Sequence, residues 1–297
     1  MTGFSYNHLK KTALHILLAA GAFSSLVAQP IKAETPVSAA EPPNLRQETL
    51  AAFREYVSLT EHRNAGELGK ATEFIWIDAL PSSEREQANA ALRSGEVKIR
   101  RLEIRKGGEK IHCSGGLIHH WVGVVFIAGA HIEDVLDVLQ DYNHHAQYYA
   151  PDVERSKLEQ RDGDHFVAFL RFRRHKVITV VLDTQHDVHY FRDSDEKAHS
   201  RSSATRIAQV ENTGKPNERE KSPGDDDGFL WGMETWWRMW EHDGGVYVQS
   251  EVVSLTRTIP TGLGWLIGPF VTSIPKETLT FTLEATRRAV QAHRKLE

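Results

Sequence analysis

The sequence predicts an α+β fold in which a curved antiparallel sheet wraps a long C-terminal helix. Three observations favour it: short strands joined by tight turns fill the second half of the chain, two short helices follow the first of them, and the last segment has a wide non-charged helical face. On an α-helix, the non-charged arc of that segment covers roughly 200°, whereas a surface helix needs little more than about 100°. Leu279, Leu283, Thr286 and Val290 form the centre line of this arc, with Phe281 beside it. A helix buried that far is expected to be enclosed by a sheet.

Residues 1–28 have the pattern of an export signal. Lys10 and Lys11 precede a largely apolar run, and Ala28 behind it is a small residue suited to cleavage. Ala33 offers a second cleavage position. An uncleaved membrane anchor is the alternative reading, although the run is shorter than the ~20 residues that a membrane span needs.

Composition narrows the class of protein. The content of 40% hydrophobic and 26% charged residues is that of a soluble globular chain. A formal net charge of −4 argues against nucleic acid as a partner, because phosphate binding depends on clustered positive charge. Cys113 is the only cysteine, so no intrachain disulfide forms and a buried inert thiol is expected. Together with the export signal, this predicts a bacterial periplasmic protein.

Residues 29–43 predict a flexible linker, because proline, alanine and glutamate dominate them. The following residues, 44–112, predict an accessory segment to which no chemistry can be assigned. Its expected elements are, in chain order, a helix ending near Thr60, a short apolar segment at 74–80, a helix opened by the capping box of Ser83 and Glu86 and stopped by Gly95, a strand at 97–104 and a turn at 106–110.

Residues 113–297 predict the main domain. A strand at 117–128 precedes an amphipathic helix at 132–139, whose apolar residues follow the i, i+3, i+4, i+7 spacing, and a second short helix or turn lies at 141–151. Six strands are then expected at 153–160, 165–174, 177–191, 198–210, 228–240 and 246–258. A polar loop at 212–227 interrupts them, and Pro275 is expected to open the terminal helix, where a missing N–H costs nothing.

Three segments carry a resemblance to a known family: GAHIEDVLDVLQDYNHHAQYYAPDVERSKL, GFLWGMETWWRMWEHDGGVYVQSEVVSLTR and SIPKETLTFTLEATRRAV. Their order and pattern resemble the START / polyketide cyclase-like (SRPBCC) superfamily of helix-grip proteins, over about residues 115–290. The resemblance implies a START-like domain, with a sheet of seven strands around the terminal helix and a cavity between them for an apolar or amphipathic ligand. It brings no catalytic signature.

Aromatic residues on the predicted strands are the expected lining of that cavity. Trp231 and Trp236 lie on the strand with four tryptophans, and Tyr190 lies on another. Ordinary core packing is the alternative, since alternation sends some of these side chains to each face. Tyr149 stands in a cluster near the short helices, where the mouth of the cavity is expected.

Charged residues between apolar neighbours give two alternatives. Arg171, Arg238 and Glu251 are either members of cross-strand ion pairs or a polar patch that orients the headgroup of a ligand. Buried charges persist only when they are paired. The ion-pair interpretation is therefore favoured over the polar patch.

Metal binding is not expected, despite sixteen histidines. His119 and His120 are adjacent on a strand and point to opposite faces, as do His186 and His189, and no HExxH motif occurs. The sequence therefore predicts no metal site and no cofactor.

The segment Gly262–Phe270 predicts a loop with an apolar tip around Trp265. It would cover the mouth of the cavity, touch a membrane transiently, or pack on the core. The combined interpretation is a carrier or sensor of a hydrophobic, lipid-like small molecule. One alternative is a polyketide cyclase/dehydratase-like enzyme: no GxSxG motif is present, but the resemblance implies that such enzymes use scattered cavity residues, so the missing motif does not exclude one. The other alternative is a ligandless protein-interaction module. Oligomeric state is not predicted.

Overall fold

A computed structural model describes residues 47–70, 73–175, 178–222, 225–258 and 264–295, with the backbone alone for 264–273. Contacts divide the chain into residues 1–41 and a compact unit of residues 42–297, and every described residue belongs to the second unit. The predicted signal at 1–28 and linker at 29–43 lie outside the described residues. Within the part that is described, no helix is both long and apolar enough to span a bilayer.

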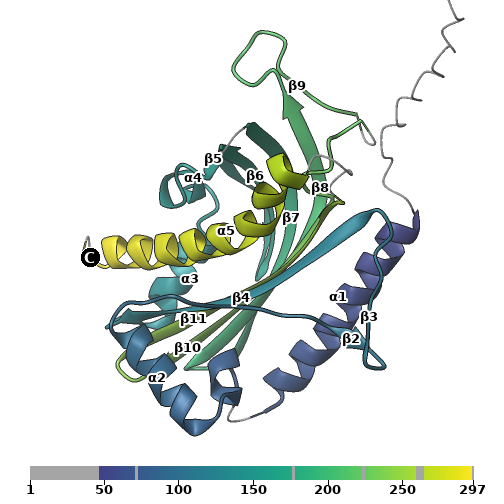
Figure 1. Ribbon diagram of the computed structural model, residues 1–297. Coiled ribbons are helices and arrows are strands. Elements are labelled where there is room, and N and C mark those ends of the chain that lie inside the picture. The colour runs from purple at the N-terminus through teal and green to yellow at the C-terminus, as the bar shows by residue number, and fades with distance from the viewer. Residues whose placement is uncertain (1–46, 71–72, 176–177, 223–224, 259–263, 296–297) are drawn as a thin grey trace, which may run out of the picture. The chain divides into compact units, whose positions relative to one another are not determined.

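One large antiparallel sheet organises this unit (Figure 1). The first strand after the accessory segment, β4, pairs with the last strand, β11, so the first and last strands of the main domain lie side by side near the β1 edge of the sheet. In spatial order the strands are β1 (Lys98–Arg101), β4 (Gly116–Ala128), β11 (Gly245–Arg257), β10 (Gly232–His242), β8 (Lys197–Glu211), β7 (Thr179–Ser194), β6 (His165–His175) and β5 (Val153–Asp162), with β9 (Arg219–Glu220) paired to the end of β8. A separate small hairpin joins β2 (Arg105–Lys106) and β3 (Glu109–Lys110).

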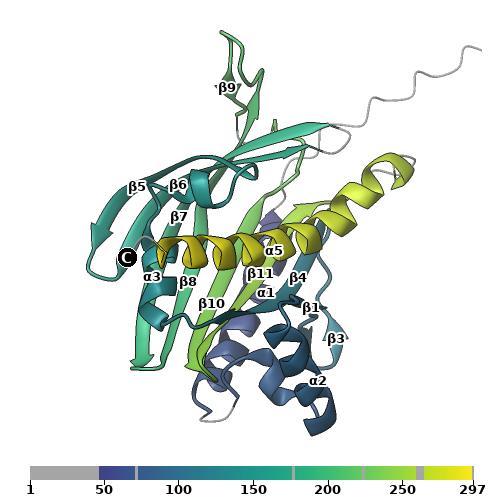
Figure 2. The same ribbon diagram turned by 90° about the vertical axis from the view of Figure 1, so that its left-hand side faces the viewer.

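One face of the sheet, here called the inner face, is crossed by α5 (Gly264–His293) (Figure 2). Two short helices, α3 (Ile132–Gln140) and α4 (His145–Tyr148), lie between β4 and β5 in the chain. Leu279, Leu283 and Val290 of α5 are buried in one cluster with residues of β4 and α3. The predicted α+β helix-grip fold, a curved antiparallel sheet around a long C-terminal helix, is confirmed.

Close approach of α5 to the sheet depends on a glycine of β4. A Cβ atom added at Gly123 would lie 2.6 Å from Cδ1 of Leu283 and 2.6 Å from Cδ1 of Ile99. Real Cβ atoms do not come so near a neighbour, so a larger residue here would push the helix off the sheet.

The predicted start of the terminal helix was wrong. The helix begins at Gly264 and not at Pro275, so the part of the predicted Gly262–Phe270 loop from Gly264 onward is helical. Proline inside a helix removes one backbone hydrogen bond and bends the helix, but the helix can continue on both sides of it. Figure 2 shows α5 bent in its first part. Gly262 and the side chain of Trp265 lie outside what is described.

The accessory segment covers the opposite, outer face of the sheet. Its helices are α1 (Gln47–Leu68), the 3₁₀ turn η1 (Trp76–Ala79) and α2 (Ser82–Arg93), which begins after Pro81 rather than at the predicted capping box of Ser83. Phe53 and Tyr56 of α1 are buried against Trp236 and Val253 of the sheet. A second cluster joins η1 and α2 to β4 and β11. The sheet therefore lies between the accessory helices on one side and α5 on the other.

Candidate functional site

A cavity of about 300 Å³ lies between the inner face of the sheet and α5. Seven strands, the α3–α4 region and α5 all contribute to its wall. Most of the wall is apolar, and its large members include Trp121, Leu170, Phe172, Val188, Trp237 and Phe281. Ligand pockets are typically apolar with a few placed polar groups and measure roughly 300–1,000 Å³. This cavity has that character and stands at the small end of the range.

Two tyrosines form a hydrogen-bonded pair in the wall. The Tyr190 hydroxyl donates to the carbonyl of Leu139 over 2.9 Å and lies 2.9 Å from the hydroxyl of Tyr142, which therefore donates to it. This pair joins the end of α3 to β7. Burial raises the pKa of both phenols above the ordinary value, so they stay neutral.

Two buried histidines also face the cavity. Nε2 of His145 donates to the Val138 carbonyl over 3.2 Å, and His186 contacts the hydroxyls of Thr184 at 2.9 Å and Ser202 at 3.4 Å. Burial lowers the pKa of each imidazole to about 4. At neutral pH the wall therefore offers uncharged donors and acceptors here.

A hydroxyl in the middle of the wall lacks a partner. Ser200 of β8 lines the cavity and is 1% exposed, and its Oγ has no hydrogen bond to any residue that the structure describes. Leaving a buried hydroxyl unpaired costs about 1–3 kcal/mol. A polar atom of a bound molecule at this position would remove that cost.

One ion pair belongs to the wall. Arg174 of β6 donates to Asp152 over 2.6 Å and to the Thr278 hydroxyl of α5 over 2.6 Å. Burial raises the pKa of Asp152 and lowers that of Arg174, and their mutual attraction opposes both shifts. Among the described lining residues these two are the acidic and basic members apart from histidine. The pair connects α5 to the edge of the sheet.

The structure places the predicted lining residues in different surroundings. Tyr149 and Tyr190 lie in the cavity wall. Trp236 is corrected to the outer face, where it packs against α1, because the side chains of β10 that face inward are Met233, Thr235 and Trp237. Strand alternation predicts two faces, and only the packing of α1 and α5 shows which is which.

Trp231 also lies outside the cavity lining. It packs at the border of the cluster that α1 makes with the sheet, and its Nε1 donates to Asp226 over 2.7 Å. It stands just before β10, where its indole anchors the end of the polar 212–227 segment. Neither of the two tryptophans predicted to line the cavity does so, whereas Met233 and Trp237 of β10 do.

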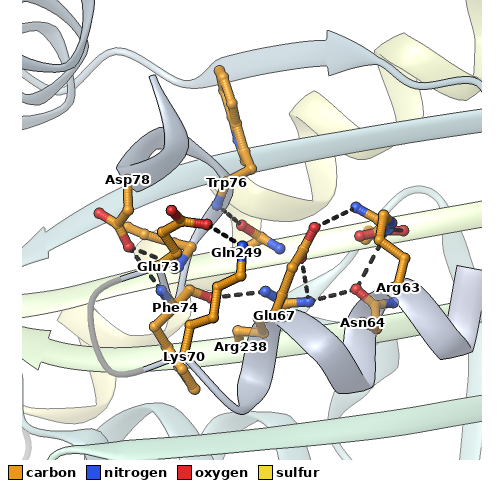
Figure 3. Close-up of polar contacts among 12 residues, drawn as sticks. Arg63, Asn64, Glu67, Lys70, Glu73, Phe74, Trp76, Asp78, Arg238 and Gln249 are labelled. Carbon is orange, nitrogen blue, oxygen red and sulfur yellow. Dashed lines mark hydrogen bonds and ion pairs between the residues drawn. The ribbon is translucent and has the colours of Figure 1, made fainter. Parts of the chain in front are cut away.

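Arg238 and Glu251 are corrected to a buried polar layer between α1 and the outer face. Arg238 donates to the Phe74 carbonyl over 2.9 Å, to Glu67 over 2.8 Å and to Asn64 (Figure 3). Of the two alternatives, the ion pair holds, although its acidic partner comes from the accessory segment. Trp76 adds a backbone N–H to Gln249 at 2.7 Å. This layer fastens the accessory helices to the sheet.

Glu251 stands at the other end of the same layer. It accepts hydrogen bonds from Nε2 of His120 at 2.7 Å and from Arg63 of α1. The second nitrogen of His120, Nδ1, lies 3.0 Å from the Tyr56 hydroxyl, which also accepts the Ile104 backbone N–H. Burial would raise the pKa of Glu251, but the His120 hydrogen bond and the Arg63 charge hold it below the ordinary value.

Arg171 is likewise corrected to the outer face. It forms a bidentate pair with Asp183 at 2.6 and 2.7 Å, and it reaches Glu218 at 2.7 Å. The hydrogen bonds that Arg171 donates to Asp183 raise the pKa of the guanidinium above its ordinary value. This arginine fixes the 212–227 segment against β6 and β7, and it has no path to the cavity.

Comparison with known proteins concerns the fold. No protein-family model matches the sequence, and a search of curated proteins gave no significant match. Among solved structures, the chain is similar to a STAR-related lipid transfer protein from Xanthomonas axonopodis (fragment 25–204; 19% identity, TM-score 0.41, 65% of this chain and 98% of that one). It is also similar to the Zhui aromatase/cyclase from Streptomyces sp. R1128 (14%, 0.39, 61% and 97%) and to human STARD10 (10%, 0.41, 77% and 85%). The strand order and the position of α5 on the inner face give this chain a START-like helix-grip fold, as the sequence resemblance predicted.

Proposed function

We propose that this protein binds a small hydrophobic molecule in the cavity between the sheet and α5, as a carrier or sensor. The observation that carries the proposal is the cavity itself, whose wall is apolar apart from a few buried, neutral hydrogen-bonding groups and the ion pair of Arg174 and Asp152. Such a wall favours a mostly apolar molecule and fixes its orientation through one or two polar atoms.

The size and polarity of the cavity narrow the ligand class. At about 300 Å³ it suits a single chain or a compact ring system rather than a lipid with two long chains. The unpartnered Ser200 hydroxyl and the imidazole of His186 both face it. We therefore expect a lipid-like molecule that carries an oxygen atom, such as a hydroxyl or carbonyl group, within its apolar body.

The alternative of a polyketide cyclase/dehydratase-like enzyme rests on the tyrosines and histidines of the wall. General acids and bases work best when their pKa lies near the working pH. Burial lowers the pKa of His145 and His186 to about 4 and raises that of Tyr149 to about 12. These groups are suited to hold a ligand by hydrogen bonds, and their weak basicity and acidity favour binding over turnover.

Fluorescence titration with 1-anilinonaphthalene-8-sulfonate, an apolar probe, tests the binding proposal. We expect saturable binding of one probe per chain, and at least tenfold weaker binding by Ser202→Leu, which fills the cavity. Thr205→Leu, at an exposed position of the same strand, is the matched control and should bind as wild type does.

Native mass spectrometry of gently purified protein supplies the second measurement. A co-purified molecule that is lost in Ser202→Leu supports the carrier, whereas a chemically altered product after incubation supports the enzyme. A protein that carries nothing and binds no probe would leave only the ligandless interaction module, and the binding proposal would be abandoned.

Export belongs to the same proposal. We infer from residues 1–28 that the chain is exported, and that it acts in a bacterial periplasm. N-terminal sequencing of the protein from cells tests this. A mature chain that begins at Gln29 or close to Glu34 supports export, and a chain that begins at the initiator methionine in a soluble cytoplasmic fraction contradicts it.

Transient membrane contact is proposed for the segment that begins α5. Trp265, Leu266 and Ile267 follow one another there, and such residues suit a membrane interface. Flotation with phosphatidylglycerol vesicles tests it: wild type should float and Trp265→Asp should stay in solution. If both proteins stay in solution, the ligand is exchanged without this contact.

A further inference from the structure

A group of three metal-ligating side chains lies on the outer face of the sheet, away from the cavity. His165 of β6 is the direct cross-strand partner of His189 on β7, and Asp187 precedes His189 by two residues on the same face. One ligand atom from each of the three lies within 4.8 Å of the other two. All three are partly exposed, so an ion from solution can reach them.

The two imidazoles point at a single carboxylate. Nε2 of His165 lies 2.9 Å from one oxygen of Asp187, and Nε2 of His189 lies 2.9 Å from the other. The rings are stacked, with centroids 4.3 Å apart and planes at 6°. Two neighbouring strands hold the three side chains together on one face, so only side-chain rotations are needed to bring them to one ion.

The surrounding charges leave the site negative. Aspartate at a partly exposed position is ionised at neutral pH, so Asp187 brings one negative charge to the group. Arg201 of β8 lies beside His189 in register, and its guanidinium pairs with Glu61 at 2.5 Å. That arginine is thus already engaged by a carboxylate of α1.

We propose that His165, Asp187 and His189 bind one divalent transition-metal ion, of which Zn²⁺ is the representative. Two neutral imidazoles and one carboxylate are ligands that zinc, nickel and copper accept, and a three-ligand site leaves room for water in the fourth position. Both rings would carry their proton on Nδ1 and offer Nε2 to the ion. Side-chain rotations that bring each nitrogen to about 2.0–2.1 Å complete the site.

Calorimetric titration of the full mature chain with Zn²⁺ tests the proposal. The protein should carry no polyhistidine tag and should first be treated with a chelator. We expect one ion per chain, and at least tenfold weaker binding by His165→Ala and by His189→Gln. His175→Ala removes an exposed histidine from the same strand as His165 and is the matched control, with wild-type affinity expected.

Thermal unfolding keeps the result interpretable if a variant is less stable. Zn²⁺ should raise the melting temperature of wild type and His175→Ala and leave that of His165→Ala unchanged, whatever its starting value. The proposal fails if wild type takes up no ion at a hundred micromolar Zn²⁺, or if the triad variants and the control bind it equally. Probe binding in the cavity should be the same with and without the ion, so this test is independent of the ligand proposal.

Discussion

The Tyr149 hydroxyl lies 3.1 Å from Oγ1 of Thr286, and this contact joins α4 to α5 at the cavity wall. The threonine hydroxyl donates to the Thr282 carbonyl over 2.9 Å, so Tyr149 is the donor to Thr286. Both residues are buried. Because residues of both α4 and α5 line the cavity, this bond directly links two elements of its wall.

Tyr149→Phe is expected to lower the free energy of unfolding by about 1 kcal/mol, the usual worth of one buried hydrogen bond. Thr286 keeps its bond to Thr282, so no unsatisfied donor remains. Urea denaturation of Tyr149→Phe, Thr286→Val and the double variant measures it. If the bond matters, the double variant loses less than the sum of the two single losses. Additive losses would show that the contact contributes nothing.

The pH dependence of stability should reflect Glu251. Its pKa in the folded protein is below the ordinary value of about 4.3, so it contributes stability above that pH and loses it as the pH falls through the folded value. Glu251→Gln should therefore be clearly less stable than wild type at pH 7, with a difference that shrinks below about pH 4.

Chemical denaturation at pH 7, 5 and 3 checks this expectation. Glu86→Gln, at an exposed position of α2, is the control and should follow wild type at every pH. A gap between Glu251→Gln and wild type that stays constant from pH 7 to pH 3 would contradict the assigned role.

Arg238→Ala separates structure from ligand binding. Arg238 is 2% exposed, and its removal leaves Glu67, Asn64 and the Phe74 carbonyl without their shared donor. Breaking a buried ion pair costs about 3–5 kcal/mol, and partial exposure of Glu67 places the expected loss near the lower end. The affinity of the folded variant for 1-anilinonaphthalene-8-sulfonate should equal that of wild type, because Arg238 lies on the outer face. A tenfold weaker affinity in a folded variant would return this arginine to the ligand site.

Much of the fold can be predicted from sequence patterns, but which face of each strand lines the cavity cannot. The strand, two short helices, six strands and final helix appear in the predicted order because turn residues and periodicity are local signals. Alternation on β10 separates Trp236 from Trp237 but does not say which one meets the cavity. That depends on α1, whose packing on the outer face joins residues far apart in the sequence.

The candidate sites show the same limit. The sequence predicts Tyr149 and Tyr190 near the ligand. His186 enters the sequence analysis only as a possible second metal ligand beside His189, whose side chain points to the other face. The group of His165, Asp187 and His189 was not found from the sequence, because His165 lies on a different strand from the other two. A register between β6 and β7, which pairs His165 with His189, would have been needed to find it.

Two serines of β8 give the sharpest comparison of the two faces of the sheet. Ser200 faces the cavity with an unpartnered hydroxyl, whereas Ser203 donates to Glu234 over 2.6 Å. In protein stripped of ligand, Ser200→Ala should raise the free energy of unfolding by about 1 kcal/mol, because it removes an unsatisfied buried group, and Ser203→Ala should lower it by a similar amount. Urea denaturation after solvent extraction measures both. If Ser200→Ala destabilises the stripped protein, its hydroxyl is satisfied without a ligand, and the expected ligand oxygen at this position is not needed.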